Sequence, residues 1–135
     1  MTLLSPTTAL KLVQAAHGLE LDLLPIQGLW TEQQYLKLTD QTNHLVEFDD
    51  GSIEVLPMPT ERHQAIVEFL FLMLRACIEQ LGGKVRFAPL RLQLQTGRFR
   101  EPDILLLRDA SDPRRQDRFW LGADFVAEIV SPDDP

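Results

Sequence analysis

The chain has 135 residues, of which 44% are hydrophobic, and a formal net charge of −7. This length fits one domain with its own core, and the negative charge argues against a general polyanion-binding protein, which must neutralise phosphates with Lys and Arg. The single cysteine, Cys77, excludes an intrachain disulfide and a cysteine-rich zinc site, and its apolar helical context predicts a small buried thiol.

The start of the chain has no basic segment followed by an apolar stretch that could be a signal peptide or a membrane span. We therefore expect a cytoplasmic protein that does not bind membranes. Residues 1–30 are predicted to form an N-terminal extension, with a short helix over residues 9–16, because prolines and glycines interrupt their scattered leucines. Residues 31–135 are expected to form the folded domain.

The domain is expected to begin with a short helix and a hairpin. Thr31 is a suitable N-cap for a helix through Leu38. Residues 44–48 and 52–56 then predict two strands, and the acidic turn Asp49-Asp50-Gly51 between them is typical of a hairpin.

A long helix is predicted over residues 61–81, with Thr60 as its N-cap and Gly82-Gly83 as its end. Its apolar residues recur at helical spacing and form a wide stripe, so we expect the helix to be largely buried. The residues of this stripe are Ile66, Phe69, Leu70, Leu72, Met73, Leu74, Cys77 and Leu81.

Strands are predicted after the helix at residues 84–87, 91–94, 103–107 and 125–130, with a polar loop through residue 118 between the last two. Strands before and after one long helix indicate an α/β or α+β domain whose sheet packs on that helix.

Basic side chains are concentrated between residues 84 and 118. This stretch holds nine basic and five acidic side chains, a local net charge of +4, so that the rest of the chain carries −11. Such a stretch could contact the phosphates of a nucleic acid, but a solvated charged loop gives the same count.

Two acidic residues stand at the edges of apolar strands: Asp103 in Glu-Pro-Asp-Ile-Leu-Leu-Leu and Glu128 in Asp-Phe-Val-Ala-Glu-Ile-Val-Ser-Pro. A carboxylate among apolar side chains loses hydration and needs compensation, and a metal ion can serve two carboxylates at once. If the two strands are neighbours in a suitable register, the acids can share a Mg²⁺ ion. The alternative is that each acid is solvated at a strand end or paired with an arginine.

Two further residues are candidates for the same site. Glu47, in Leu-Val-Glu-Phe, alternates with the apolar residues of its strand, although a solvent-facing hairpin glutamate gives the same pattern. His63 lies in the first turn of the long helix and shares a face with Ile66, Leu70 and Leu74. It could be a hydrogen-bonded core histidine, or it could hold a phosphate or a water beside metal-bound carboxylates.

Taken in order, these motifs resemble the Uma-type putative restriction endonuclease family of the PD-(D/E)xK nuclease superfamily. The resemblance covers residues 31–135 and implies a restriction-endonuclease-like fold, with a mixed β-sheet packed against a long helix. It implies DNA phosphodiester hydrolysis with Mg²⁺ or Mn²⁺ as cofactor, Asp103 and Glu128 as metal ligands, and Glu47 and His63 as further catalytic residues. It also implies a homodimer, because related folds commonly dimerise to cut two strands.

The sequence departs from the superfamily pattern at one position. Val130 stands two residues after Glu128, where the superfamily usually has its catalytic lysine. The family tends to supply a lysine from a helix after the Ser131-Pro132 turn, and the resemblance therefore leads us to expect that the domain is truncated at Pro135. A second possibility is that one of the clustered basic residues substitutes for it, and a third is that the basic residue is missing.

Three functional hypotheses follow. The first is a metal-dependent endonuclease that uses Asp103 and Glu128. The second is a non-catalytic binding or self-association domain on the same fold, in which the acids are retained polar groups and residues 1–28 mediate association. The third is a small-molecule phosphoesterase, which would share the metal site but would show no salt-dependent affinity for DNA.

Overall fold

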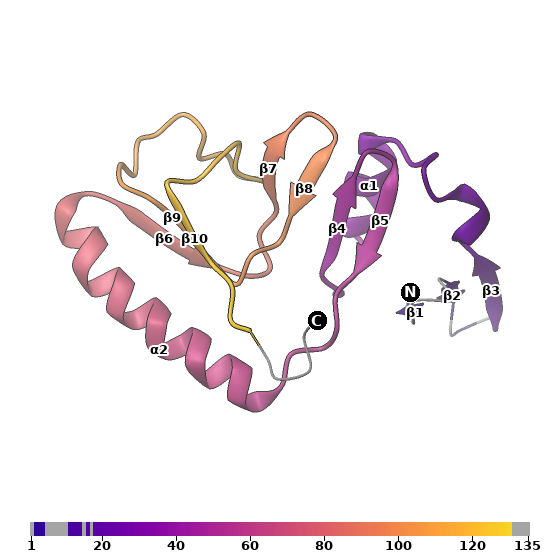
Figure 1. Ribbon diagram of the computed structural model, residues 1–135, viewed down its shortest axis with the longest axis horizontal. Helices are drawn as coiled ribbons and strands as arrows, with labels where there is room; N and C mark the ends of the chain where they lie inside the picture. The colour runs from indigo at the N-terminus through magenta and orange to yellow at the C-terminus, as the bar shows by residue number, and fades with distance from the viewer. Residues whose placement is uncertain (1, 5–10, 15, 17, 131–135) are drawn as a thin grey trace. The chain divides into compact units, whose positions relative to one another are not determined.

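The computed structural model describes residues 2–4, 11–14, 16 and 18–130 (Figure 1). The chain divides into two compact units, Met1–Met58 with Gln95–Phe99, and Pro59–Leu94 with Arg100–Pro135. Among the described residues, no helix is both long and apolar enough to cross a membrane. The predicted division of the chain at residue 30 stays a prediction.

The first unit starts with an antiparallel sheet of β1 (Thr2–Leu4), β2 (Lys11–Gln14) and β3 (Leu19–Asp22), in that order. The helix predicted over residues 9–16 is therefore wrong where the structure describes it, because residues 11–14 are a strand. Apolar and polar residues alternate in Leu19–Asp22, which is the period of a strand. Hydrogen bonds to β3 satisfy the backbone groups of β2, which a helix would have satisfied internally. Residues 9, 10 and 15 of that predicted helix lie outside the described residues.

The predicted short helix and its cap are confirmed. After a 3₁₀ turn, η1 (Leu24–Ile26), helix α1 runs over Glu32–Thr39. The Thr31 hydroxyl accepts a hydrogen bond from the Gln34 amide at 3.1 Å, and the Gln34 side chain accepts one from the Thr31 amide at 3.0 Å. This reciprocal pair satisfies two amides that a helix start leaves without intrahelical partners.

The predicted hairpin is also confirmed, as β4 (Val46–Asp49) and β5 (Ser52–Val55). Asp50 and Gly51 both have positive φ, 47° and 91°, as a two-residue type I′ turn requires. A strand that the sequence did not reveal, β8 (Arg98–Arg100), pairs with β4. It has only three residues and follows a turn, so it shows no periodicity of its own.

The core of the first unit is built around Tyr35 of α1. Its ring lies 5.2 Å from the ring of Phe48 and 5.2 Å from that of Phe99, and its hydroxyl donates a hydrogen bond to the carbonyl oxygen of Val46 at 2.6 Å. The tyrosine therefore joins the helix to β4 by packing and by a polar bond at once. Val46 and Phe48 face this core, so Glu47 points to the other side of the strand.

The second unit contains the long helix and a second sheet. Helix α2 (Glu61–Ile78) is followed by the 3₁₀ turn η2 (Glu79–Leu81) and by Gly82 with φ 88°. Strands β6 (Lys84–Phe87), β9 (Ile104–Leu107) and β10 (Phe125–Ala127) form an antiparallel sheet in the order β10-β9-β6. Figure 1 shows α2 running alongside this sheet.

The prediction that α2 is largely buried is wrong. Its core face packs on Val85, Ile104 and Leu106 of the sheet through the residues Val67, Leu70, Phe71, Leu74 and Ile78. The neighbouring face, with Ile66, Phe69, Leu72, Met73 and Cys77, is exposed; Phe69 is 62% accessible. The apolar residues extend over more of the helix circumference than one three-stranded sheet can cover, and the predicted buried thiol lies on the uncovered part.

The other face of this sheet carries a separate apolar cluster. Leu105 and Leu107 pack against Leu92 of β7 (Leu92–Gln95) and against Trp120. Trp120 forms a parallel bridge with Leu92, and the Gln93 amide donates to the Trp120 carbonyl at 2.8 Å. Both faces of β9 are therefore covered, which explains why all of its residues are buried. The fold class predicted from the sequence, α+β with a long helix on a sheet, is confirmed.

We predict that Thr60→Ala lowers the free energy of unfolding by about 1 kcal/mol, the usual cost of a lost N-cap. The Thr60 hydroxyl accepts a hydrogen bond from the His63 amide at 3.1 Å and so fixes the first turn of α2. Urea denaturation would measure the change. Thr60→Ser keeps the hydroxyl and should retain the wild-type value; an equal loss in both variants would contradict the role of the cap.

Candidate active site

The Asp103 carboxylate lies at the start of β9 and joins three elements. The residue is only 8% accessible. Its Oδ2 atom accepts a hydrogen bond from the Ile129 amide at 2.6 Å and lies 3.2 Å from His63 Nε2. A buried carboxylate needs such partners, and these come from the segment after β10 and from the first turn of α2.

Glu128 lies opposite Asp103. In the β9–β10 ladder Ala127 pairs with Ile104, so the next step of the same register sets Glu128 against Asp103. Directly opposed residues of an antiparallel pair have Cα atoms about 4.5–5.5 Å apart. The strands are thus neighbours, in a register that brings the two acids together.

Two details of Glu128 differ from the prediction. The strand ends at Ala127 instead of Val130, and Glu128 is exposed rather than held among buried apolar side chains. The ladder stops because the position opposite Ile129 is Pro102, which has no amide to donate, and the Asp103 side chain takes the Ile129 amide instead. Ser131 and Pro132, which complete the motif, lie outside the described residues.

His63 points toward this acidic pair from α2. It is held by the Thr60 cap through its backbone, and its Nε2 atom faces Asp103 Oδ2 while Nδ1 lies 3.2 Å from Gln64 Oε1. A contact between Nε2 and a carboxylate oxygen requires a proton on that nitrogen. His63 is therefore hydrogen-bonded to Asp103 at the edge of the core, and a role beside metal-bound carboxylates stays a prediction.

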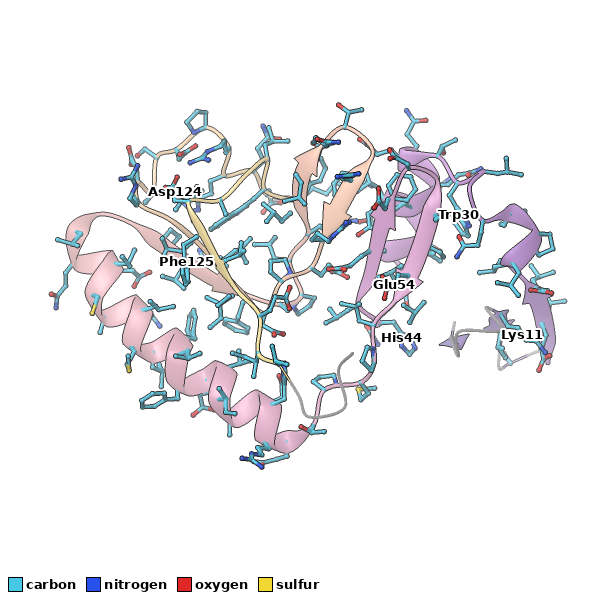
Figure 2. All side chains as sticks on the ribbon, in the orientation of Figure 1. Lys11, Trp30, His44, Glu54, Asp124 and Phe125 are labelled. Carbon is cyan, nitrogen blue, oxygen red and sulfur yellow. The ribbon has the colours of Figure 1, made fainter. Side chains whose placement is uncertain are left out.

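Glu47 lies in the first unit, whereas Asp103 and Glu128 lie in the second. Glu47 sits on β4 directly opposite Glu54 of β5, on the face away from Tyr35 and Val46, and is half-buried. Figure 2 labels Glu54 on this hairpin. The role of Glu47 as a third acid stays a prediction.

The donor set of the pair fits a hard divalent cation. Among residues 2–4, 11–14, 16 and 18–130, no three His, Cys, Asp or Glu side chains converge as a ready-made metal cage. Mg²⁺ does not require such a cage, since it keeps several waters and binds through one or two carboxylates plus substrate phosphates. Asp103 and Glu128 supply carboxylate oxygens of that kind.

Glu101 is a buried acid that was not among the site residues predicted from the sequence. It is 6% accessible and stands two residues before Asp103, at the beginning of a segment that is buried from residue 101 to residue 107. The sequence signal that could have identified Glu101 is its place in Glu-Pro-Asp before an apolar run, because Pro102 fixes the chain between the two acids.

Several side chains of the basic stretch are bonded to partners within their own unit. Lys84 is paired with Glu79 at 3.1 Å, and Arg98 with Asp49 at 3.0 Å. Arg91 is buried and donates to the Arg118 carbonyl. Most of these side chains therefore stabilise the fold, and the local charge of the sequence overstates what is available to a ligand.

The loop before β10 is held by a charged cluster around Arg114. Its guanidinium contacts Asp112 Oδ2 at 2.8 Å and Asp124 Oδ1 at 2.7 Å, and both bonds raise the pKa of Arg114 above its ordinary value. Asp124 also accepts the Arg108 amide at 2.8 Å, and this bond, followed by the Arg114 contact, lowers the pKa of Asp124. Asp124 stands directly before Phe125, where β10 begins (Figure 2).

Comparison with known proteins agrees with this architecture. The family Uma2, putative restriction endonuclease, matches residues 32–135. The chain belongs to this family. No curated protein matches the chain.

A solved structure supports the assignment to Uma2. The chain is similar to a putative nuclease of DUF820 from Anabaena variabilis, with 26% identity and a TM-score of 0.64 over 78% of this chain. The match spans 60% of the length of that protein. The chain therefore has the fold of a nuclease-like Uma2 protein, and restriction-endonuclease-like proteins generally use divalent metal ions.

We predict that Asp124→Asn lowers the melting temperature at pH 7 and that this difference shrinks as the pH falls below about 4. Because the pKa of Asp124 is lowered by folding, its contribution is present above the unfolded pKa and is lost as the carboxylate is protonated. Thermal unfolding between pH 7 and pH 2 would measure it. Glu68→Gln, at an exposed position of α2, is the control; an equal effect at both pH values would contradict the ionic role of Asp124.

Proposed function

We propose that this protein is a metal-dependent endonuclease that hydrolyses DNA phosphodiester bonds, with Mg²⁺ or Mn²⁺ as cofactor. The observation that carries the proposal is the β9–β10 register, which sets Glu128 opposite a buried Asp103 within a Uma2 domain. The name of the Anabaena relative, a putative nuclease, supports the same reaction class.

Asp103 and Glu128 would hold the cation through their carboxylate oxygens. The cation supplies polarisation of the phosphate and a lower pKa of the attacking water. His63 fixes the Asp103 carboxylate from one side and the Ile129 amide fixes it from the other, so the oxygen that faces a ligand is held in place. This outer support is typical of metal-binding carboxylates.

In this arrangement, fewer of the clustered basic residues are candidates to replace the catalytic lysine of the superfamily. Val130 carries no base, as the sequence indicated. Lys84 is paired with Glu79, and it is the register partner of Leu107 at the end of β9 away from Asp103, so it cannot take the role of the superfamily lysine. Glu47 remains the proposed third acid. Homodimerisation and a cytoplasmic location stay predictions.

We predict that Mn²⁺ binds saturably to this chain and that Asp103→Ala and Glu128→Ala each abolish the binding. Isothermal titration calorimetry would measure it. Asp109→Ala is the matched control, because Asp109 is an exposed aspartate after the other end of β9. Binding that survives both site variants, or wild-type protein that binds no Mn²⁺, would favour the binding-domain hypothesis over the nuclease.

We predict that His63→Ala weakens Mn²⁺ binding by about 10- to 100-fold without abolishing it, the usual effect of losing an outer partner of a metal ligand. The same calorimetric titration would separate this graded loss from the complete loss in Asp103→Ala. His63→Gln can still donate one hydrogen bond to Asp103 and should recover part of the affinity. If His63→Ala behaved as wild type, its contact with Asp103 would have no part in metal binding.

A further inference from the structure

A pocket of about 410 Å³ lies in the second unit. One wall comes from the end of β6 and the segment after it, and the other from the loop that leads to Trp120. The lining residues are Arg86, Phe87, Pro89, Leu90, Arg115, Gln116, Asp117 and Trp120. The pocket therefore combines two guanidinium groups with apolar walls and two further polar side chains.

Register assigns Arg86 of this pocket to one face of the sheet. Arg86 pairs with Leu105 on β9, and Leu105 is two residues from Asp103. The carboxylate of Asp103, by contrast, contacts His63 of α2. Register partners on neighbouring antiparallel strands share a face, so Arg86 projects with Leu105 from the face opposite α2.

The two arginines of the pocket differ from the other arginines of this region. Arg86 donates to the carbonyl of Val85 at 3.0 Å, and Arg115 donates to that of Ala110 at 3.1 Å. Neither forms an ion pair with a carboxylate of the residues that the structure describes, whereas Arg98, Arg108 and Arg114 each do. Their charge is thus not neutralised within the described part of the fold.

We propose that this pocket binds a nucleotide of the DNA strand, with Arg86 and Arg115 on its phosphate and the apolar wall of Leu90, Pro89 and Trp120 against the sugar and base. Guanidinium groups match the geometry of phosphate oxygens, and polar side chains such as Gln116 and Asp117 can accept or donate at the edge of a base. The inference rests on the proposed nuclease function and adds a place where one nucleotide of the substrate strand is held.

Trp120, which lines the pocket, can report ligand binding by its fluorescence. The chain has two tryptophans, so a Trp30→Phe background leaves Trp120 alone. In this background, without any metal, the thymidine dinucleotide pTpT should quench Trp120 fluorescence saturably. Arg86→Gln and Arg115→Gln should each weaken this binding about tenfold, and thymidine without phosphate should not compete.

The matched control is Arg75→Gln, an exposed arginine of α2 that pairs with Glu79 outside the pocket. Arg86→Lys, which keeps the charge, should retain part of the affinity and shows that loss in Arg86→Gln is not a folding defect. As a second readout, fluorescence anisotropy of a labelled 12-nucleotide strand gives the binding constant K at several salt concentrations. The slope of log K against log salt concentration should become shallower by about 0.7 in each glutamine variant, because each loses one phosphate contact.

Equal pTpT binding and equal salt dependence in Arg75→Gln, Arg86→Gln and Arg115→Gln would overturn the proposal, as would an absence of binding in both assays. The Mn²⁺ titration tests the proposed nuclease function separately from the proposed nucleotide pocket. Both arginine variants should bind Mn²⁺ as wild type does, and arginine-dependent pTpT binding in a protein that binds no Mn²⁺ would sustain the pocket while removing the catalytic role.

Discussion

The buried carboxylate of Asp103 constrains the site more than any other group. It is the one acid of the candidate pair that is withdrawn from water, and its Oδ2 atom draws the Ile129 amide and the His63 ring toward the start of β9. A buried carboxylate without such partners would cost several kcal/mol, so the chain segments that supply them are fixed together. The start of α2, the start of β9 and the end of β10 therefore meet at one point.

The same contact explains the position of Glu128. The strand cannot continue along Pro102, and the Asp103 side chain takes the amide that would otherwise seek a ladder partner. Glu128 is thereby left at the end of the ladder, opposite Asp103 and accessible to solvent. A buried acid next to an exposed one suits a site that must exchange waters and substrate oxygens, because the exposed side remains open to both.

Local signals predicted much of the fold, and long-range packing accounts for the rest. The Thr31 and Thr60 caps and the Asp50-Gly51 turn follow from a few neighbouring residues, so the sequence was sufficient for them. The exposed face of α2 was not predictable, because helical spacing does not tell which part of a wide apolar surface meets the sheet. The sequence singled out Asp103 and Glu128 as acids at the edges of apolar strands. It did not reveal that the two strands pair in a register that sets these acids opposite each other. The pocket arginines were hidden within a basic stretch whose other members are mostly paired.

The arginines of the second unit differ in whether a carboxylate neutralises their charge. Arg114 is held between Asp112 and Asp124, which fixes the loop before β10, and this use of a cation leaves no charge for a ligand. Arg115, its neighbour, turns instead to a backbone carbonyl and to the pocket. A carbonyl orients a guanidinium without neutralising it, so the group keeps its attraction for phosphate. A protein with net charge −7 can in this way attract a polyanion locally, where two such groups line one pocket.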